Sequence, residues 1–292
     1  MDFTVKSYNH EADHERVGAF LRSINHDHAV TPHYLWGRWS WQFGPYMNPE
    51  HYDRIGLFEV DGEIVGLATY ENDVGEAYLC ADEKYPELKA QLVAYAAEHL
   101  ADAEGKIKIC LPDGDAELRK AAQAMGFVAT EEKGATARLE MDDFETALPE
   151  GFRFITFADP EFDAAKYYDA IWRGFDNERP RNEVEQASMD SGEEFVSFGY
   201  DMSLRIMVVA PNGDYAAHCG MWYADGEECA YVEPVFTVPE YRRMGLAKAA
   251  VLEGSKRCGE RGAKCSIVLS SQQFYYNIGF YPYQNETWWV KK

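Results

Sequence analysis

An internal repeat limits the fold of this chain more than any other feature of its sequence. Turn and glycine positions of the first half recur in the second half after almost the same interval. The offsets are 151 residues from Asp61-Gly62 to Asn212-Gly213, 154 from Gly66 to Gly220, and 153 from Gly126-Phe127 to Gly279-Phe280. Near-equal offsets, with one shared order of predicted elements, indicate two copies of one fold. We predict domains at residues 1–146 and 151–292, joined near Pro149.

Periodicity and turn signals place matching strands and helices in the two copies. In the first copy we expect strands at residues 3–8, 76–80 and 106–111, helices at 11–24, 87–101 and 115–125, a hairpin at 54–70, and a last hairpin closing near Met141. In the second copy we expect a strand at 152–156, a helix at 163–175, a polar loop at 176–182, and a hairpin at 203–223. The Asp-Gly and Asn-Gly pairs form the hairpin tips.

Net charge and composition restrict the partners. The formal charge of −22 would repel nucleic acid, and it suits a cationic acceptor such as an amine.

The sequence contains no run of eighteen apolar residues that would predict a membrane helix, and the N-terminus lacks the apolar region of a signal peptide. We therefore expect a cytoplasmic protein whose six cysteines, which show no CxxC spacing, are reduced residues of strands or helices.

Histidines and tryptophans cluster near the start of the chain. His26, His28 and His33 do not have recognisable zinc spacing, so we expect no metal. The stretch containing Trp36 and Trp39 is aromatic enough to line an acceptor pocket. Core packing is the commoner role of such residues, and we favour it here.

One segment of the second copy has the properties of an anion site. An apolar strand from Glu233 leads through a proline turn and two arginines to Gly245, and a predicted helix follows. Backbone N–H groups at a helix N-terminus have no intrahelical partner, and the helix dipole adds positive charge. Residues 241–264 contain seven Lys and Arg against two acids. A phosphorylated ligand would explain this cluster, and a solvated helix face is the alternative.

This segment resembles motif A of the GNAT superfamily of N-acetyltransferases. The family pattern Gln/Arg-x-x-Gly-x-Gly/Ala is met by Arg242, Gly245 and Ala247. Downstream, Tyr275 to Phe280 is similar to the Tyr-x-x-x-Gly-Phe ending of GNAT domains. The resemblance covers about the last 140 residues. It implies an α/β (α+β) fold of two tandem domains, each a mixed, mostly antiparallel, splayed sheet flanked by helices.

The resemblance also implies a cosubstrate, a reaction and their residues. Acetyl-CoA, or another acyl-CoA, would donate its acyl group to a small-molecule or peptide amine. The diphosphate would bind the turn amides, and the pantetheine arm would pair with the strand before them. The cofactor-binding residues would be Val235, Phe236, Thr237, Arg242, Arg243, Met244, Gly245, Leu246, Ala247 and Lys248.

Two residues are candidates for catalysis. Tyr275 stands at the family position of the general acid that protonates the leaving thiolate, and packing is its alternative role. Glu233 is the candidate base for the amine, with a structural or charge-binding role as the alternative. Arg179 and Arg181 are either substrate-binding or solvated loop residues, and Asp225 belongs to an ordinary turn.

The first copy departs from the pattern and resembles a degenerate GNAT domain. Residues 81–86 offer no glycine, and Asp82 and Glu83 stand where phosphates would bind. The second copy also departs once, because Val268 replaces an Asn that is frequent in the family. The leading hypothesis is an N-acetyltransferase that is active in its C-terminal half. The alternative is a non-catalytic acyl-CoA-binding regulatory protein of the same fold.

Overall fold

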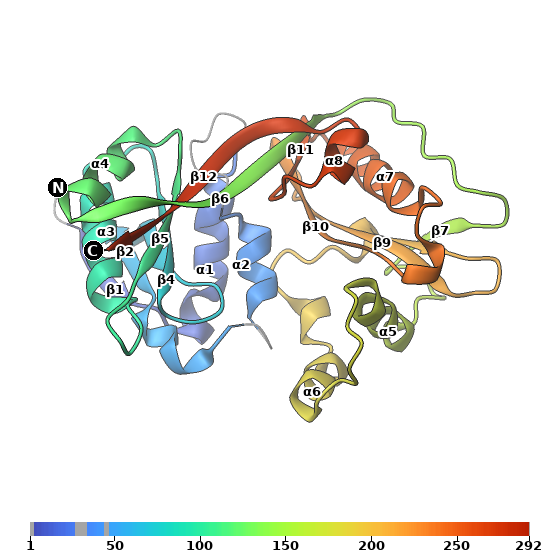
Figure 1. Cartoon of the computed structure of the whole chain (residues 1–292), viewed down its shortest axis with the longest axis horizontal. Helices are drawn as coiled ribbons and strands as arrows, with labels where there is room; N and C mark the ends of the chain where they lie inside the picture. Colours follow the sequence, from blue (N-terminus) through green and yellow to red (C-terminus); the bar gives the residue numbers. More distant parts are fainter. Residues whose placement is uncertain (1–2, 27–33, 44–46, 292) are drawn as a thin grey trace. The chain divides into compact units, whose positions relative to one another are not determined.

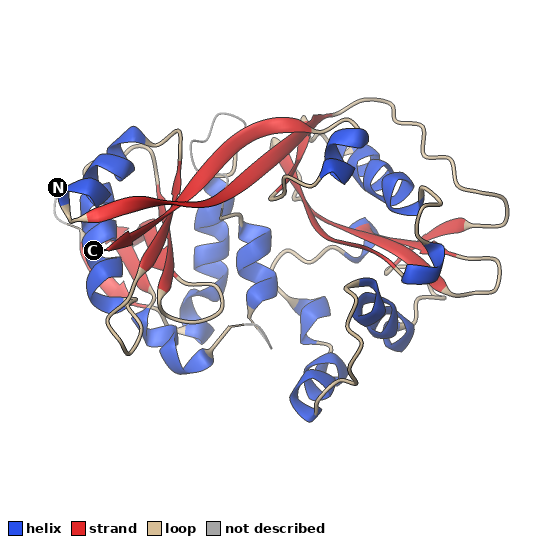
Figure 2. Ribbon diagram, in the orientation of Figure 1, coloured by secondary structure: helices blue, strands red, loops and turns tan. Residues whose placement is uncertain are grey.

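The computed structural model describes residues 3–26, 34–43 and 47–291 (Figures 1 and 2). The chain forms two compact units. The first comprises Met1–Ala137, Leu269–Ser271 and Pro282–Lys292, and the second comprises Arg138–Val268 and Gln272–Tyr281. We describe each unit by itself. Strands β6 and β12 belong to both, because each of them passes from one unit into the other.

The first unit is a mostly antiparallel sheet with helices. Its elements are β1 (Thr4–Ser7), α1 (His10–Ser23), α2 (Trp36–Gln42), η1 (Pro49–Arg54), β2 (Gly56–Val60), β3 (Glu63–Thr69), β4 (Glu76–Ala81), α3 (Leu88–His99), β5 (Lys108–Pro112), α4 (Ala116–Ala124) and β6 (Phe127–Glu140). The strand order is β1-β2-β3-β4-β5-β12-β6, and the β4–β5 pair is parallel. Asp61 and Gly62 have φ of 52° and 87°, as a two-residue hairpin turn requires.

The second unit repeats this order of elements. It contains β7 (Arg153–Thr156), α5 (Ala164–Gly174), α6 (Glu183–Ser191), η2 (Glu193–Val196), η3 (Met202–Leu204), β8 (Arg205–Val209), β9 (Tyr215–Trp222), β10 (Cys229–Thr237), η4 (Pro239–Tyr241), α7 (Leu246–Glu260), β11 (Cys265–Val268), α8 (Gln273–Asn277) and the start of β12 (Tyr281–Lys291). The strand order is β6-β11-β10-β9-β8-β7. Helices α7 and α5 pack on β9 and β10 from opposite faces (Figure 1). The predicted mixed sheet and its flanking helices are confirmed.

The hairpin predicted near Met141 is wrong. Residues 127–140 form one continuous strand, β6, and the strand beside it is β12 from the end of the chain. Residues 286–290 of β12 pair antiparallel with residues 108–112 of β5. A pairing partner so distant in sequence leaves no local signal, which is why the periodicity of residues 127–141 was compatible with a hairpin. The division at 1–146 and 151–292 remains our proposal for the two sequence repeats.

The buried residues explain two further sequence features. Trp36 and Trp39 are fully buried, which confirms core packing for these two tryptophans. All six cysteines are buried and none forms a disulfide in the described chain, and five lie on strands and one on α7, as expected. His28 and His33 lie outside the described residues. Among those described, no group of side chains could hold a metal ion, and no helix is long and apolar enough to span a membrane.

Candidate active site

The turn between β10 and α7 is shaped by two residues with positive φ. Arg243 has φ of 65°, and Gly245, the N-cap of α7, has φ of 79°. This conformation favours glycine at residue 245, because a Cβ there strains the backbone. A Cβ on Gly245 would meet no protein atom within 4 Å. The turn is therefore open to solvent on that side, as an approaching ligand requires.

The amide groups of this turn are not used by the fold. In the described chain, the N–H groups of residues 243–248 donate no hydrogen bond, and the first bond of this region runs from Ala249 N–H to the Gly245 carbonyl. Six successive unpaired donors at the start of a 15-residue helix are groups of the kind that can bind an anion. Arg243, Gly245 and Lys248 are also exposed.

The cationic cluster is smaller than its sequence suggests. Five of the seven Lys and Arg of residues 241–264 are neutralised by acidic partners. These pairs are Arg242–Asp176, Lys256–Asp143, Arg257–Glu253, Arg261 with Asp201 and Asp225, and Lys264–Glu228. Within the residues that the structure describes, Arg243 and Lys248 have no ion-pair partner. The positive charge free for a ligand is therefore concentrated at the unpaired amides.

Arg242 has a structural role in this structure. Its Nε donates to the Thr237 carbonyl at 3.1 Å, and its Nη2 donates to the Gly174 carbonyl at 3.1 Å and to Asp176 at 2.8 Å. These bonds join the end of β10 to the end of α5. Arg242 thus fixes the position of the turn, while its neighbour Arg243 remains available to an anion.

Strand β10 separates from β11 just before the turn. The parallel β10–β11 pairing covers residues 229–231, whereas the β9 pairing continues to Thr237. Val235 to Thr237 therefore have one edge without a strand partner in the described chain, and such an edge can pair with an extended ligand. The Phe236 side chain is buried against α5, where a Cβ on Gly174 would lie 2.6 Å from its ring. Only the backbone of Phe236 can contact a ligand.

Glu233 lies at the irregularity of β10. The register with β9 shifts between Val232 and Val235, and the Glu233–Pro234 peptide is cis. The Glu233 carbonyl accepts hydrogen bonds from Trp222 Nε1 at 3.0 Å and Arg205 Nη1 at 3.2 Å. A Cβ on Gly220 would lie 2.5 Å from that carbonyl oxygen, so only glycine fits opposite it. The backbone of the candidate base is therefore firmly held.

The chain reverses its direction after α8, and this reversal holds Tyr275 in place. The Tyr-x-x-x-Gly-Phe spacing encodes the reversal. Gly279 has φ of 109° at the end of α8, and the Phe280 N–H donates to the Tyr275 carbonyl at 3.1 Å. This bond is typical of a helix C-terminus that ends in glycine. The Phe280 ring contacts the Tyr275 ring at a centroid distance of 5.5 Å. The spacing of Tyr, Gly and Phe thus fixes one buried tyrosine on a short helix.

Burial raises the pKa of the Tyr275 hydroxyl, and the nearby Glu233 carboxylate and Cys219 thiol raise it further. The two candidate catalytic residues, Tyr275 and Glu233, are therefore close enough in the structure for the Glu233 charge to affect the pKa of Tyr275. The hydroxyl stays protonated through the physiological pH range and can donate a hydrogen bond to a developing thiolate. The same shift makes full proton transfer from Tyr275 less favourable than from an ordinary phenol.

The corresponding turn of the first unit is internally satisfied. Lys84 N–H donates to the Asp82 carboxylate at 2.9 Å, Tyr85 N–H to the Asp82 carbonyl at 2.9 Å, and Leu88 N–H to the Tyr85 carbonyl at 3.0 Å. Three amides of this turn are thus used by the chain itself, and one of their acceptors is the Asp82 carboxylate.

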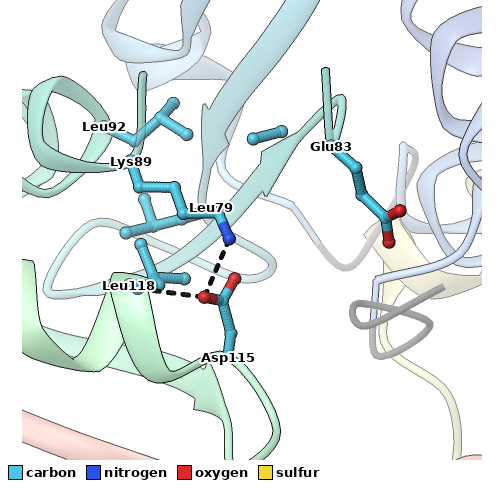
Figure 3. A pocket seen from close by; sticks show the side chains of 7 residues that line it. Leu79, Glu83, Lys89, Leu92, Asp115 and Leu118 are labelled. Atoms are coloured by element: carbon cyan, nitrogen blue, oxygen red, sulfur yellow. Dashed lines mark hydrogen bonds and ion pairs between the residues drawn. The ribbon is translucent and has the colours of Figure 1, made fainter. Parts of the chain in front are cut away.

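A small cavity beside this turn is also closed. It has a volume of about 10 Å³, room for about one water molecule. Figure 3 shows the Lys89 ammonium donating to Asp115 at 2.9 Å across it, and Leu118 N–H donating to the same carboxylate. Glu83 also lines this cavity. This cavity is too small for a cosubstrate.

Several residues near the site were judged from sequence alone. Arg179 pairs with Glu185 and Arg181 with Asp169, so both serve the α5–α6 region. Asp225 pairs with Arg261 in the turn before β10. Helix α6 was not predicted from the sequence, although Asn182 and Glu185 form a capping box, and no role was predicted for Arg205. The sequence does contain one signal for Arg205, because it is a single arginine directly before the apolar residues 206–210.

The diverging strands, the turn with unpaired amides and the Tyr275 motif define the class: a GNAT-type acetyltransferase fold. Residues 164–281 match the family model described as Acetyltransferase (GNAT) family. No curated protein matches the chain in a sequence comparison.

Solved structures share the fold over nearly the whole chain. An acetyltransferase of the GNAT family from Colwellia psychrerythraea is 15% identical with a TM-score of 0.61, covering 99% of this chain and 100% of its own. A tandem GNAT protein from the clavulanic acid biosynthesis pathway is 13% identical with a TM-score of 0.59, covering 99% and 98%. A GCN5-related N-acetyltransferase from Sphaerobacter thermophilus is 17% identical with a TM-score of 0.57, covering 99% and 95%. These likenesses establish a tandem GNAT arrangement.

Proposed function

We propose that this protein transfers an acetyl group from acetyl-CoA to an amine, and that the reaction takes place in the second unit. The observation that carries this proposal is the contrast between the two turns. The amides of residues 243–248 are unpaired and lie beside the exposed cations Arg243 and Lys248, whereas the first unit satisfies its turn with Asp82. A diphosphate would supply the missing acceptors.

Binding would use the backbone of the second unit. The diphosphate contacts the turn amides, and the two amide groups of pantetheine pair with the free edge of Val235 to Thr237. This pairing directs the thioester along β10 toward Glu233 and Tyr275. The thioester supplies an activated acyl group. The protein therefore has to position this group, remove a proton from the amine and supply a proton to the leaving sulfur.

Each catalytic residue then handles one proton. The amine must lose a proton to attack the acyl carbon, because a free alkyl amine is mostly protonated at pH 7. Glu233 accepts that proton, directly or through water. As the carbon–sulfur bond breaks, Tyr275 donates its hydroxyl hydrogen to the leaving sulfur. Tyr275 is well suited to remain protonated until that moment, since burial raises its pKa.

Calorimetry and a turnover assay together test this function. We expect coenzyme A to bind with a stoichiometry of one per chain, and acetyl-CoA to release thiol when an amine acceptor is present. A stoichiometry of two would contradict a degenerate first unit. Binding without thiol release for any amine would favour the alternative, a regulatory acyl-CoA-binding protein. Absence of binding would overturn both.

A further inference from the structure

A buried arginine lies beside the candidate base and is only partly bonded. Arg205, the first residue of β8, is 1% exposed. Its guanidinium contacts two aromatic rings that are perpendicular to each other, at 3.9 Å from the Tyr200 ring centroid and 4.0 Å from the Trp222 centroid. Cation–π contacts of this kind hold the guanidinium in place and leave its N–H groups to bind other partners.

One edge is used and one is empty. Nη1 donates to the Glu233 carbonyl at 3.2 Å. Nε and Nη2 are buried and have no hydrogen-bond partner in the described chain. Unpaired donors on a buried cation are costly, and native proteins rarely leave them unpaired without a functional reason.

The empty edge has the geometry of a carboxylate site, and this protein provides its own comparison. Arg138 uses the same two nitrogens to hold Glu140, with Nε–Oε1 at 2.7 Å and Nη2–Oε2 at 3.0 Å. Arg38 holds Glu71 through the same pair of nitrogens. Nε–H and Nη2–H point in one direction and match the two oxygens of a carboxylate. In Arg205 this fork is vacant.

Two buried titratable groups, Glu194 and His218, lie close enough to Arg205 to interact with its charge. Glu194 is the nearby carboxylate, but it accepts a hydrogen bond from the Tyr167 hydroxyl at 3.0 Å and forms no ion pair with Arg205. Burial raises the pKa of Glu194, while the Tyr167 hydrogen bond and the Arg205 charge oppose this shift. Burial, and then the Arg205 charge, hold the pKa of His218 well below its ordinary value, so His218 adds no positive charge of its own.

The position of the fork links it to the acceptor. The Glu233 peptide is bonded directly to Arg205, and the Glu233 side chain is the proposed base for the acceptor amine. We propose that the acceptor is an amino carboxylate, a small molecule of the amino acid class, and that its carboxylate binds Nε and Nη2 of Arg205. Arg205 is then a specificity-determining residue. This inference rests on the proposed function.

Matched acceptors test the inference. Thiol release from acetyl-CoA is measured with amino acids and with the amines formed by their decarboxylation, such as glycine and methylamine, lysine and cadaverine, tyrosine and tyramine. We expect at least one amino acid to exceed its amine in kcat/KM by tenfold or more. An acceptor without a carboxylate would leave Nε and Nη2 of Arg205 unpaired, and a buried site selects strongly against such an acceptor. Arg205→Lys keeps the charge and removes the fork, so this ratio should fall at least tenfold, mainly through KM.

The control is Arg138→Lys, which removes an occupied fork of the same unit and should leave the ratio unchanged. Thermal unfolding and acetyl-CoA affinity are measured for each variant. If Arg205→Lys does not fold, wild-type selectivity alone decides. The inference is overturned if the amines react as well as the amino acids, if no amino acid reacts, or if the ratio survives in Arg205→Lys. Failure of acetyl-CoA binding would instead overturn the proposed function.

Discussion

At the scale of single residues, the proposed ligand contacts are assigned to groups that the fold leaves unpaired. The exposed cations of the second unit are mostly bonded to acids, yet Arg243 and Lys248 have no ion-pair partner in the described chain. Two nitrogens of the buried Arg205 are also vacant. Since folded proteins pair nearly all buried polar groups, the vacant nitrogens of Arg205 support its proposed contact with a ligand.

Tyr275→Phe tests the proposed acid. The substitution removes the hydroxyl hydrogen that would reach the leaving sulfur, so we expect kcat to fall by about 10²-fold or more while acetyl-CoA affinity is unchanged. Because the pKa of Tyr275 is raised, ionisation of this residue should cause no loss of wild-type activity up to about pH 10. Stopped thiol-release assays and calorimetry measure both quantities. Tyr276→Phe is the neighbouring control, and full activity of Tyr275→Phe would exclude the assigned role.

At the scale of elements, α7 and β12 carry the two most informative features. The N-terminus of α7 offers amides and free cations, while the same helix further along pairs its charges with Asp143 and Glu253. Strand β12 supplies a sheet position to the first unit and brings a buried carboxylate with it. Each element can be tested separately.

Charge removal at the turn tests the first of these elements. We expect Arg243→Gln and Lys248→Gln each to weaken coenzyme A binding about 10-fold or more, because each loses a charge-assisted contact with phosphate. The effect should shrink as salt concentration rises. Lys256→Gln, on the same helix but paired with Asp143, is the matched control and should bind normally. Equal affinities for all three variants would place the diphosphate elsewhere.

Glu286 makes the stability of the first unit depend on pH. Burial raises the pKa of this β12 residue from 4.5 to about 7, and one of its oxygens has no partner in the described chain. The folded state keeps this proton between those values while the unfolded state releases it, so this group lowers stability as pH rises from 4.5 to 7. Glu286→Gln should therefore stabilise the protein at pH 8 by about 2–3 kcal/mol and have little effect at pH 4.

Denaturant unfolding at the two pH values measures this difference. Glu131→Gln, an exposed substitution on β6, is the control. A gain in stability that is the same at pH 4 and pH 8 would show that packing, rather than ionisation, is responsible.

At the scale of the whole molecule, the two repeats exchange strands. The last strand of the chain fills the sheet of the first unit, and the last strand of the first repeat extends into the second. The first unit is therefore incomplete without the C-terminal residues, although the proposed site residues all belong to the second.

Trp288→Ala tests this dependence. Trp288 is 9% exposed, packs against Tyr78 at a centroid distance of 5.5 Å, and lies under the Lys108 ammonium. We expect a loss of about 3–5 kcal/mol in the free energy of unfolding, from the lost burial and the cavity left behind. Coenzyme A affinity of the folded fraction should be retained. Val196→Ala, at an exposed apolar residue, is the control, and a similar small loss in both variants would contradict the role of β12.

The sequence by itself determined the local features: the two repeats, most strands and helices, the turn at Gly245 and the Tyr275 motif. These depend on backbone preferences and short-range spacing, which periodicity and glycine positions record. Tertiary structure alone decided which charges are neutralised, that β12 rather than a local hairpin pairs with β5 and β6, and that Arg205 lies bonded to Glu233. Pairing and burial depend on residues far apart in the chain, and their energies are set only when those residues meet.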